Sequence, residues 1–412
     1  MKQKSLNKVL AFVLTLAMLL GSFAVTAFGS DPVSITPKSA LDGVTTYYKT
    51  QQKAVLTDWW ELLAVYTAGE DLTDYVLPKT AIITDNSMPS DYTGVFITEL
   101  IKGNSLSKKQ AQKLASKQDL TTGSFGYEMS NQQAWAMIAL DLYNRNADEA
   151  DKVPYDVTKA IEYLLTFQIN GNFYYSSQYP YPGVDYTGAV AIALAPYLNT
   201  DQWPDTLDSE NLINNALKYD KTEYGSYGNA DHLDYINAIN ELIAYQVGDG
   251  GFYNPYGEDN SSNSYYTKQA AVALAETVKG KSAFMDLTKN TMQYLSVDIS
   301  VQINGSIIKK TITIPSTTTV GDAVAQAVPL DTDLSDYKYY TDSTIKAPDD
   351  TLNYEDSIIA IPSNITYISS ISAAWPEGSD YAKSKLEAET IVKSQNQMKY
   401  TIVRPTLTYG HN

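Results

Sequence analysis

A ten-residue pattern recurs along the first two thirds of the chain and constrains its fold more than any other feature. DYTGVFITEL at 91–100 returns as DYTGAVAIAL at 185–194 and, in a looser form, as YYTKQAAVAL at 265–274. Repetition of this kind indicates a fold built from stacked copies of one unit. Glycine–aromatic segments recur between the copies: GSFG at 123–126, NGNFYY at 170–175, GSYG at 225–228 and DGGFYN at 249–254. The glycines predict tight turns, with an aromatic side chain filling the space beneath.

The helices expected between these turns are of two kinds. The segment 157–168 places its apolar residues on one face, whereas GAVAIALA (188–195), AWAMIAL (134–140) and AAVALA (270–275) are apolar all round. A helix that is apolar on every side must be covered on every side. The alternation predicts an inner circle of small-residue helices within an outer circle of amphipathic ones. The expected helices lie near 41–67, 91–103, 106–117, 129–145, 155–168, 184–198, 209–219, 231–246, 264–278 and 283–295.

Six segments resemble, in order, the secreted bacterial proteins with prenyltransferase/squalene-cyclase-type repeats. They are WWELLAVYTAG (59–69), DYTGVFITELIKG (91–103), NQQAWAMIALDLYN (131–144), FQINGNFYY (167–175), DYTGAVAIALAPY (185–197) and SYYTKQAAVALAE (264–276). The resemblance covers about 40–295. It implies a mainly α fold, an α/α toroid of alternating inner and outer helices, as is also found in transcobalamin and intrinsic factor.

From Val297 onward the hydrophobic period changes from helical to two. Apolar and polar residues alternate up to Ile303, and Asn304-Gly305 predicts a hairpin turn. The elements that follow are a returning strand TITIP (311–315), a short helix VGDAVAQAV (320–328), and strands YKYY (337–340) and SIIAIP (357–362). This order resembles a small β-grasp-like α+β domain. A small β domain after a toroid is also the transcobalamin arrangement.

The catalytic residue sets of toroid enzymes are missing from the sequence. The chain has no cysteine and only two histidines, so neither the zinc site of protein prenyltransferases nor a cysteine thioester can form. The DxDD acid of triterpene cyclases does not occur in 28–295. Two polar segments have bland interpretations: His232 between Asp231 and Asp234 indicates a solvated helix start, and Asp249 with Glu258, Asp259 and Asn260 an ordinary loop rather than a calcium site. We therefore expect no metal and no cofactor.

A binding role remains. We expect an exported, non-catalytic binding protein whose ligand is a corrinoid, a glycan or a peptide. One alternative is a structural cell-surface protein, and a second is an activity of the last segment of the chain. The expected ligand surface is the toroid mouth, where the starts of inner helices place four tyrosines, which serve equally well as turn plugs. They are Tyr92, Tyr186, Tyr265 and Tyr266.

A segment of 46 residues near the end of the chain resembles another family. ITYISSISAAWPEGSDYAKSKLEAETIVKSQNQMKYTIVRPTLTYG (365–410) is similar to NAD-dependent epimerases and short-chain dehydrogenases. The resemblance implies Ser370, Tyr381 and Lys385 as catalytic residues with NAD as cofactor. However, no G-x-G-x-x-G precedes the segment, and a parallel pair of strands needs cover on both faces. We expect a vestigial, partial Rossmann-type fragment added by fusion or truncation.

The first segment is typical of an export signal. Three lysines precede an apolar run, Val9 to Leu20, and Val25-Thr26-Ala27 offers a cleavage site. Removal of these three lysines changes the net charge from −17 to −20, which disfavours nucleic acid as a partner. No later stretch is long enough to span a membrane. The expected organisation is a signal peptide (1–27), a linker (28–40), the toroid (41–295), the β-grasp-like domain (296–362) and the epimerase-like fragment (363–412).

Overall fold

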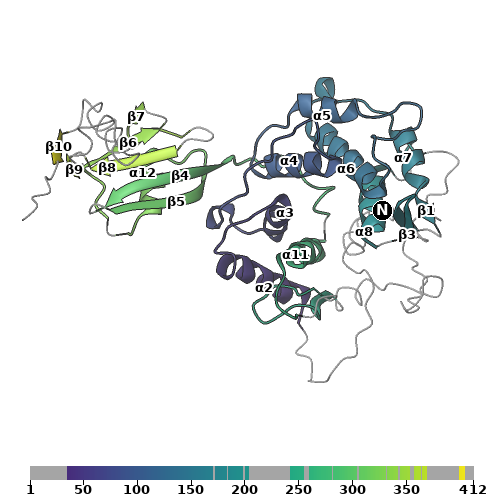
Figure 1. The fold of residues 1–412 in the computed structure, drawn as a ribbon, viewed down its shortest axis with the longest axis horizontal. Coiled ribbons are helices and arrows are strands. Elements are labelled where there is room, and N and C mark those ends of the chain that lie inside the picture. Colours follow the sequence, from purple (N-terminus) through teal and green to yellow (C-terminus); the bar gives the residue numbers. More distant parts are fainter. Residues whose placement is uncertain are drawn as a thin grey trace, which may run out of the picture. The chain divides into compact units, whose positions relative to one another are not determined.

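The computed structural model divides the chain into two compact units, Met1–Gln293 and Tyr294–Asn412 (Figure 1). The structure describes residues 35–169, 172–182, 184–197, 200–203, 242–254, 259–280, 282–303, 306–330, 332–341, 344–352, 357–362, 364–368 and 399–403. The expected signal peptide, the helix at 209–219 and most of the helix at 231–246 lie outside these ranges. So do His232 and its neighbouring aspartates.

The first unit is helical. Its helices are α2 (Pro37–Thr50), α3 (Trp59–Ala68), α4 (Pro89–Ile101), α5 (Lys108–Ala115), α6 (Ser130–Asn146), α7 (Val157–Leu165), α8 (Val184–Leu194) and α11 (Ser264–Lys279), with the short helices η1 (Leu72–Asp74), η2 (Glu149–Asp151) and η3 (Ala195–Tyr197). A small antiparallel sheet has the order β1 (Gln168–Ile169), β2 (Asn172–Ser176), β3 (Tyr179–Pro182).

The two kinds of helix predicted from the sequence are present. Helix α6 buries twelve of its 17 residues, whereas α5 buries only Ala111 and Leu114. The mostly buried helices form a row in which each packs against the next, in the order α11, α3, α4, α6, α8. The amphipathic helices pack on this row: α2 on α11, α5 on α4 and α6, and α7 on α6 (Figure 1). Helix α11, from the end of the unit, thus packs against α2 and α3 from its start.

In two neighbouring pairs of the row, α3 with α11 and α4 with α6, the helices begin at the same end. Asp58, just before α3, forms an ion pair with Lys268 near the start of α11. Between α4 and α6, the hydroxyl of Thr93 donates to the carbonyl oxygen of Trp135 at 2.9 Å. Both contacts join residues near the beginnings of their helices. The starts of α3 and α11, and those of α4 and α6, therefore lie at the same end of each pair.

Two of the glycine–aromatic turns, at 123–126 and 249–254, have the predicted geometry, whereas the one at 225–228 lies outside the described residues. Gly123 has φ of +84°, and Phe125 beside it is buried. The side chain of Gln133 on α6 holds this turn, because its Oε1 accepts from the Phe125 N–H and its Nε2 donates to the Gly123 carbonyl, both at 3.0 Å. In the turn before α11, the N–H of Phe252 donates to the Thr267 hydroxyl at 2.8 Å. Each of these two turns is thus hydrogen-bonded to the buried helix that follows it, α6 or α11.

Two helix predictions are wrong. The single helix expected at 41–67 is divided into α2 and α3, because Lys53 and Ala54 adopt positive φ and the chain turns there. Asp58 then caps the new helix by accepting from the N–H groups of Trp60 and Glu61. The helix expected at 283–295 does not form: the chain makes a turn and then runs extended into β4.

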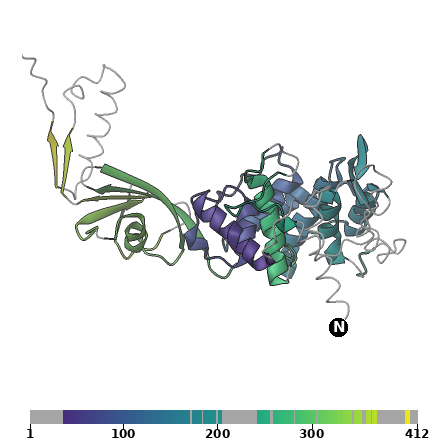
Figure 2. The same cartoon turned by 90° about the horizontal axis from the view of Figure 1, so that it is seen from below.

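The second unit contains a five-stranded mixed sheet that packs against helix α12 (Figures 1 and 2). Its elements are β4 (Tyr294–Ile303), β5 (Ser306–Pro315), α12 (Val320–Ala327), β6 (Tyr337–Thr341), β7 (Thr344–Lys346) and β8 (Ser357–Pro362). The sheet order is β5-β4-β8-β6-β7, with β4 antiparallel to β5 and parallel to β8. The alternation predicted from Val297 is confirmed, since Val297, Ile299 and Val301 are buried in one core with Val320 and Val324 of α12. The predicted turn residues Asn304 and Gly305 lie outside the described ranges.

Two further strands follow β8. Strand β9 (Asn364–Ile368) pairs in parallel with β10 (Lys399–Val403), placing Tyr367 opposite Ile402. These are the two strands that the resemblance to epimerases implied. Ser370, Tyr381 and Lys385 lie outside the described residues, so their predicted roles stay predictions.

Candidate functional site

Three of the chain's five tryptophans lie together in the helical unit. Trp59 and Trp60 begin α3 and stack with ring centroids 4.4 Å apart. Trp135 of α6 meets both rings edge-on at 5.9 Å, and Phe284 lies 5.8 Å from Trp60 and 6.1 Å from Trp135. We call these four residues the aromatic cluster. It joins α3, α6 and the segment after α11.

The aromatic cluster is only partly closed to solvent. Trp135 and Phe284 are buried, whereas Trp59 and Trp60 are half-buried. Gly94 of α4 makes room for Trp59, because a Cβ at Gly94 would lie 2.4 Å from the indole ring. Two large flat side chains thus keep part of their surface accessible while their backbone is fixed by the Asp58 cap. Flat, partly exposed aromatic surface of this kind is typical of ligand-binding sites.

Phe284 is positioned by residues 282–293, which we call the strap. The N–H of Ala283 donates to Glu276 Oε1 of α11 at 2.5 Å. Arg145, in the last turn of α6, donates through Nη2 to the Phe284 carbonyl at 2.9 Å and through Nη1 to the Met285 carbonyl. The beginning of the strap is therefore held between the carboxyl-terminal parts of α11 and α6.

The strap continues to the end of α4. The N–H of Asn290 donates to the Leu100 carbonyl at 2.8 Å, and its side-chain amide donates to the Ile101 carbonyl at 3.2 Å. The last carbonyl groups of a helix have no partner within the helix. The strap supplies such partners at the end of α4, through Asn290.

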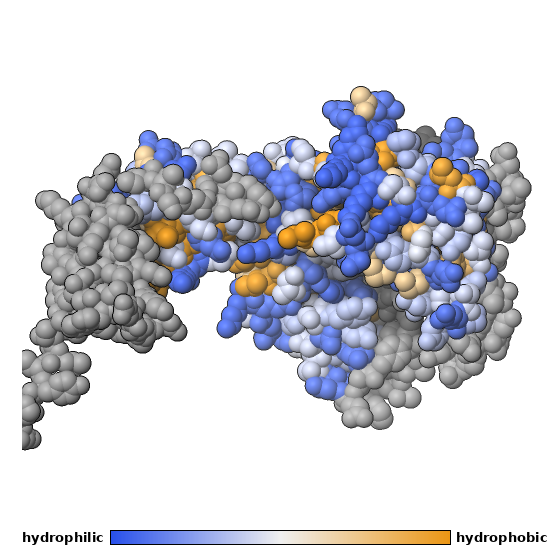
Figure 3. Space-filling model, turned by 45° about the horizontal axis from the view of Figure 1, so that its top comes forward, coloured by the Kyte–Doolittle hydropathy of each residue, from blue (hydrophilic) through white to orange (hydrophobic). Residues whose placement is uncertain are grey.

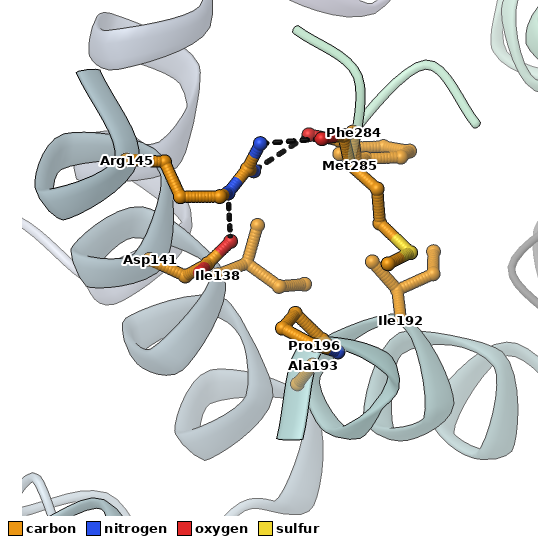
Figure 4. Close-up of a pocket in the computed structure, with 8 residues that line it drawn as sticks. All are labelled: Ile138, Asp141, Arg145, Ile192, Ala193, Pro196, Phe284 and Met285. Atoms are coloured by element: carbon orange, nitrogen blue, oxygen red, sulfur yellow. Dashed lines mark hydrogen bonds and ion pairs between the residues drawn. The ribbon is translucent and has the colours of Figure 1, made fainter. Parts of the chain in front are cut away.

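A small pocket lies between α6, α8 and the strap (Figure 4). It is lined by Ile138, Asp141 and Arg145 of α6, Ile192 and Ala193 of α8, Pro196 of η3, and Phe284 and Met285 of the strap. Arg145 Nε donates to Asp141 Oδ2 at 2.6 Å. Burial raises the pKa of Asp141 above its usual value, and the Arg145 guanidinium opposes that rise. The pocket thus has apolar walls and one closely paired charge of each sign.

Two tyrosines lie near this ion pair. The hydroxyl groups of Tyr155 and Tyr197 are hydrogen-bonded at 2.7 Å. Burial, and then the neighbouring Tyr197, raises the pKa of Tyr155. Burial, and then the negative charge of Asp141, raises the pKa of Tyr197. Both phenols therefore stay neutral at physiological pH.

The four tyrosines predicted at the mouth occupy the first turns of α4, α8 and α11. Tyr92 is fully buried, with Lys117 Nζ 5.7 Å from its ring centroid. Tyr186 is half-buried and lies 5.1 Å from Tyr175. Tyr265, with 56% of its surface exposed, contacts Tyr266 at 5.4 Å. Tyr92 is therefore part of the core, and the ligand-binding role of all four tyrosines stays a prediction.

The described acidic residues of the 248–263 loop accept hydrogen bonds from other residues of the same loop. Asp249 accepts from the Gly251 N–H and the Ser262 hydroxyl, and Asp259 accepts from Ser261. Glu258 lies outside the described residues. Within the described ranges, no group of three or more His, Cys, Asp or Glu residues is close enough to hold a metal ion. No helix in the described part of the chain is long and apolar enough to cross a membrane.

Hydrophilic residues dominate the face of the helical unit that Figure 3 shows, and the apolar residues on it form small separate patches. Individual exposed apolar side chains, such as Ile82 and Leu120, are scattered over this unit. This distribution is typical of a surface that faces solvent.

Comparisons with known proteins give a structural likeness but no match in sequence. No protein-family model matches the sequence, and no curated protein matches it. A crystal structure of haptocorrin in complex with Cbi matches over 82% of this chain and 99% of that chain, with 12% sequence identity and a TM-score of 0.32. A likeness at this level carries no inference about the ligand of this chain.

Proposed function

We propose that the chain is an exported, non-catalytic binding protein that holds its ligand on the aromatic cluster. In this proposal the helical unit is an α/α toroid, and the five-stranded unit is a β-grasp module. The row of mostly buried inner helices, covered by amphipathic helices, supports the first assignment. The sheet order β5-β4-β8-β6-β7 around α12 supports the second.

The observation that carries the proposal is the half-buried pair Trp59 and Trp60. Tryptophan is large and apolar, and leaving such a pair partly in water forgoes burial energy. The pair is not a mobile surface feature, because Trp135, Phe284 and the Asp58 cap fix it. A rigid, flat aromatic surface loses little entropy when it binds a flat macrocycle, a sugar ring or a peptide side chain. We therefore keep a corrinoid, a glycan and a peptide as the ligand classes.

A ligand panel tests this function. The mature chain would be titrated with cyanocobalamin, with soluble cell-wall oligosaccharides and with a random peptide pool, and binding measured by calorimetry. Trp60→Ala is expected to weaken binding of the active class roughly tenfold, because stacking on an aromatic ring is lost. Trp203→Phe is the matched control, since Trp203 is a buried tryptophan that is not part of the aromatic cluster. Equal affinity of Trp60→Ala and the native chain would contradict the proposal.

Two further measurements test the proposed export and the proposed lack of catalytic activity. If the chain is exported, the amino terminus of the secreted protein begins at residue 28, as Edman sequencing would show. If it is non-catalytic, purified mature chain does not turn over polyprenyl or triterpene substrates. Saturable binding of NADH, followed by its fluorescence, would instead favour the epimerase-like alternative.

A further inference from the structure

The three-stranded sheet that follows α7 carries a second group of partly exposed aromatic side chains. Tyr175 of β2 lies at the centre, with its ring centroid 5.1 Å from that of Tyr186 in α8 and 6.5 Å from that of Tyr179 in β3. We call these three residues the tyrosine patch. Tyr179 is 61% exposed, and the other two are half-buried. The tyrosine patch shares no residue with the aromatic cluster.

The backbone beneath the tyrosine patch is held in place. Phe173, two residues before Tyr175, is buried where β2 packs against α6 and α8 (Figure 1). Strand β2 pairs with β1 on one side and with β3 on the other. Pro180 and Pro182 further restrict β3, because the proline ring fixes φ. A ligand that stacks on these rings therefore has little protein motion to suppress, which favours binding.

Two kinds of partner are disfavoured at this sheet. An extended peptide that adds as a further strand needs backbone N–H groups at an edge, and the edge strand β3 contains two prolines, which have none. The other edge strand, β1, has only two residues. A lipid surface is disfavoured because the turn between β2 and β3 exposes the polar side chains of Ser177 and Gln178. The partner is therefore a molecule in water that side chains recognise.

The chain around the tyrosine patch is polar but uncharged. No charged residue occurs in 163–184, although 19% of the residues of the whole chain are charged. The hydroxyl of Ser177 and the amide of Gln178 both donate and accept hydrogen bonds. Glu162 and Asp185 bracket the segment, and both are acidic, as is the chain with its net charge of −17. An anionic ligand would thus be repelled, while a neutral one would not.

A neutral sugar chain fits these properties. The faces of a sugar ring expose C–H groups that stack on an aromatic ring, and its hydroxyl groups exchange hydrogen bonds with amides and hydroxyls. The rings of Tyr186 and Tyr179 are tilted by 40° and 54° from that of Tyr175, so together they suit successive sugars of a twisted chain. We propose that the tyrosine patch binds a neutral polysaccharide, at a site separate from the aromatic cluster.

A panel of oligosaccharides tests the proposal on the mature full chain. Cellohexaose, maltohexaose and chitohexaose are neutral, and hexagalacturonate is an anion. Binding would be measured by calorimetry at physiological salt. At least one neutral oligosaccharide is expected to bind saturably, and hexagalacturonate to bind roughly tenfold more weakly than that one, because like charges repel.

Three variants locate the binding surface. Tyr179→Ala removes the most exposed ring and is expected to weaken binding of the neutral oligosaccharide roughly tenfold, whereas Tyr179→Phe keeps the ring and should keep most of the affinity. Tyr174→Ala is the matched control, since Tyr174 is a half-buried tyrosine of the same strand whose ring contacts Phe167 instead of the tyrosine patch. Its affinity is expected to be unchanged. Circular dichroism of each variant shows whether it is folded.

The Trp60→Ala variant separates this inference from the proposed function. Oligosaccharide binding that is weakened by Tyr179→Ala and unchanged in Trp60→Ala supports the tyrosine patch as a site of its own. Binding that is lost in Trp60→Ala and unchanged in Tyr179→Ala would place the sugar on the aromatic cluster, which overturns this inference and supports the proposed function. Weakening by both variants would contradict the separation of the two sites.

Other results would also overturn the proposal. They are no saturable binding of any neutral oligosaccharide, tighter binding of hexagalacturonate, and equal weakening by Tyr174→Ala and Tyr179→Ala in folded variants. Binding of the native chain to phosphatidylcholine vesicles that is abolished by Tyr179→Ala would show that the partner is a lipid surface instead.

Discussion

The turn before α6 contains two glycines at which substitution by alanine has different consequences. At one position alanine causes only backbone strain, and at the other it also lacks space. Gly123 and Gly126 have nearly the same φ, +84° and +86°. A Cβ at Gly123 would lie 2.0 Å from the carbonyl oxygen of Lys159 in α7, far inside an ordinary contact of 3.4 Å or more. A Cβ at Gly126 would have nothing within 4 Å. Alanine at Gly126 therefore adds strain alone, and alanine at Gly123 adds strain and a clash.

The two costs can be worked out from the structure. A left-handed conformation costs an L residue about 1–2 kcal/mol, of which about 0.4–1 kcal/mol is recovered because alanine restricts the unfolded chain. Gly126→Ala is therefore expected to lower the free energy of unfolding by about 1 kcal/mol. Gly123→Ala also forces the turn away from α7. That movement breaks the hydrogen bonds of Gly123 with Asp119 and Gln133, at about 1–3 kcal/mol each, so together with the strain the total cost is about 3–7 kcal/mol.

Thermal unfolding followed by tryptophan fluorescence measures this difference. Four of the five tryptophans belong to the helical unit, so the signal mainly reports on that unit. For a unit of this size, 1 kcal/mol changes Tm by roughly 2–4 °C, so Gly126→Ala is expected to lower Tm by a few degrees and Gly123→Ala by roughly 10 °C or more. Equal decreases in Tm for the two variants would refute the close approach of the turn to α7.

Three other changes have expected outcomes. Arg145→Met removes the bonds that hold Phe284 and Met285, and it is expected to lower the free energy of unfolding in urea by about 2–3 kcal/mol; an unchanged midpoint would show that the strap is not held there. The N–H groups of Thr121 and Thr122 lower the pKa of Asp119 below 3.8, so its stabilising effect is complete above that pH and is lost as the pH falls through the lowered pKa. The stability difference between the native chain and Asp119→Asn, from urea titrations, should therefore shrink in acid, and a constant difference would exclude this titration. Truncation after Pro362 is expected to leave the calorimetric Tm of the remainder nearly unchanged, because β9 and β10 pair with each other; a fall of many degrees would show that the tail is integral to the fold.

The mostly buried helices could be predicted from the sequence because nearly all of their residues are apolar. A segment such as 134–140 has no polar face, so it must be enclosed whatever surrounds it. The alternation of apolar and polar residues in β4 could also be predicted from neighbouring residues alone, since the side chains of a strand alternate between two faces. The break between α2 and α3 was not predictable in this way. Lys53 and Ala54 adopt positive φ without glycine or asparagine, and sequence signals for turns depend on those residue types.

The aromatic cluster was not predicted from the sequence. Trp59, Trp60 and Trp135 stood within motifs that indicated the fold, yet nothing in the spacing showed that they meet. Their contact depends on α3 and α6 lying on either side of α4 with their beginnings at one end, which is a property of packing. The tyrosine prediction relied on the same helix starts, and it stays a prediction. It could not distinguish the fully buried Tyr92 from the exposed Tyr265, because both begin an apolar helix.

The strap is the feature that links the fold to the candidate site. Its conformation is determined by helix ends that are up to 190 residues away in sequence, as between Asn290 and Leu100, so no local pattern could predict it. Its apolar residues, Ala283, Phe284 and Leu287, have helical spacing, yet they are buried because the strap crosses the ends of other helices. Since the same segment carries Phe284 into the aromatic cluster and Met285 into the pocket, a change in its anchoring would alter both. The Arg145→Met variant therefore tests more than stability: if the strap positions Phe284 in the aromatic cluster, binding of cyanocobalamin, oligosaccharide or peptide should weaken as well.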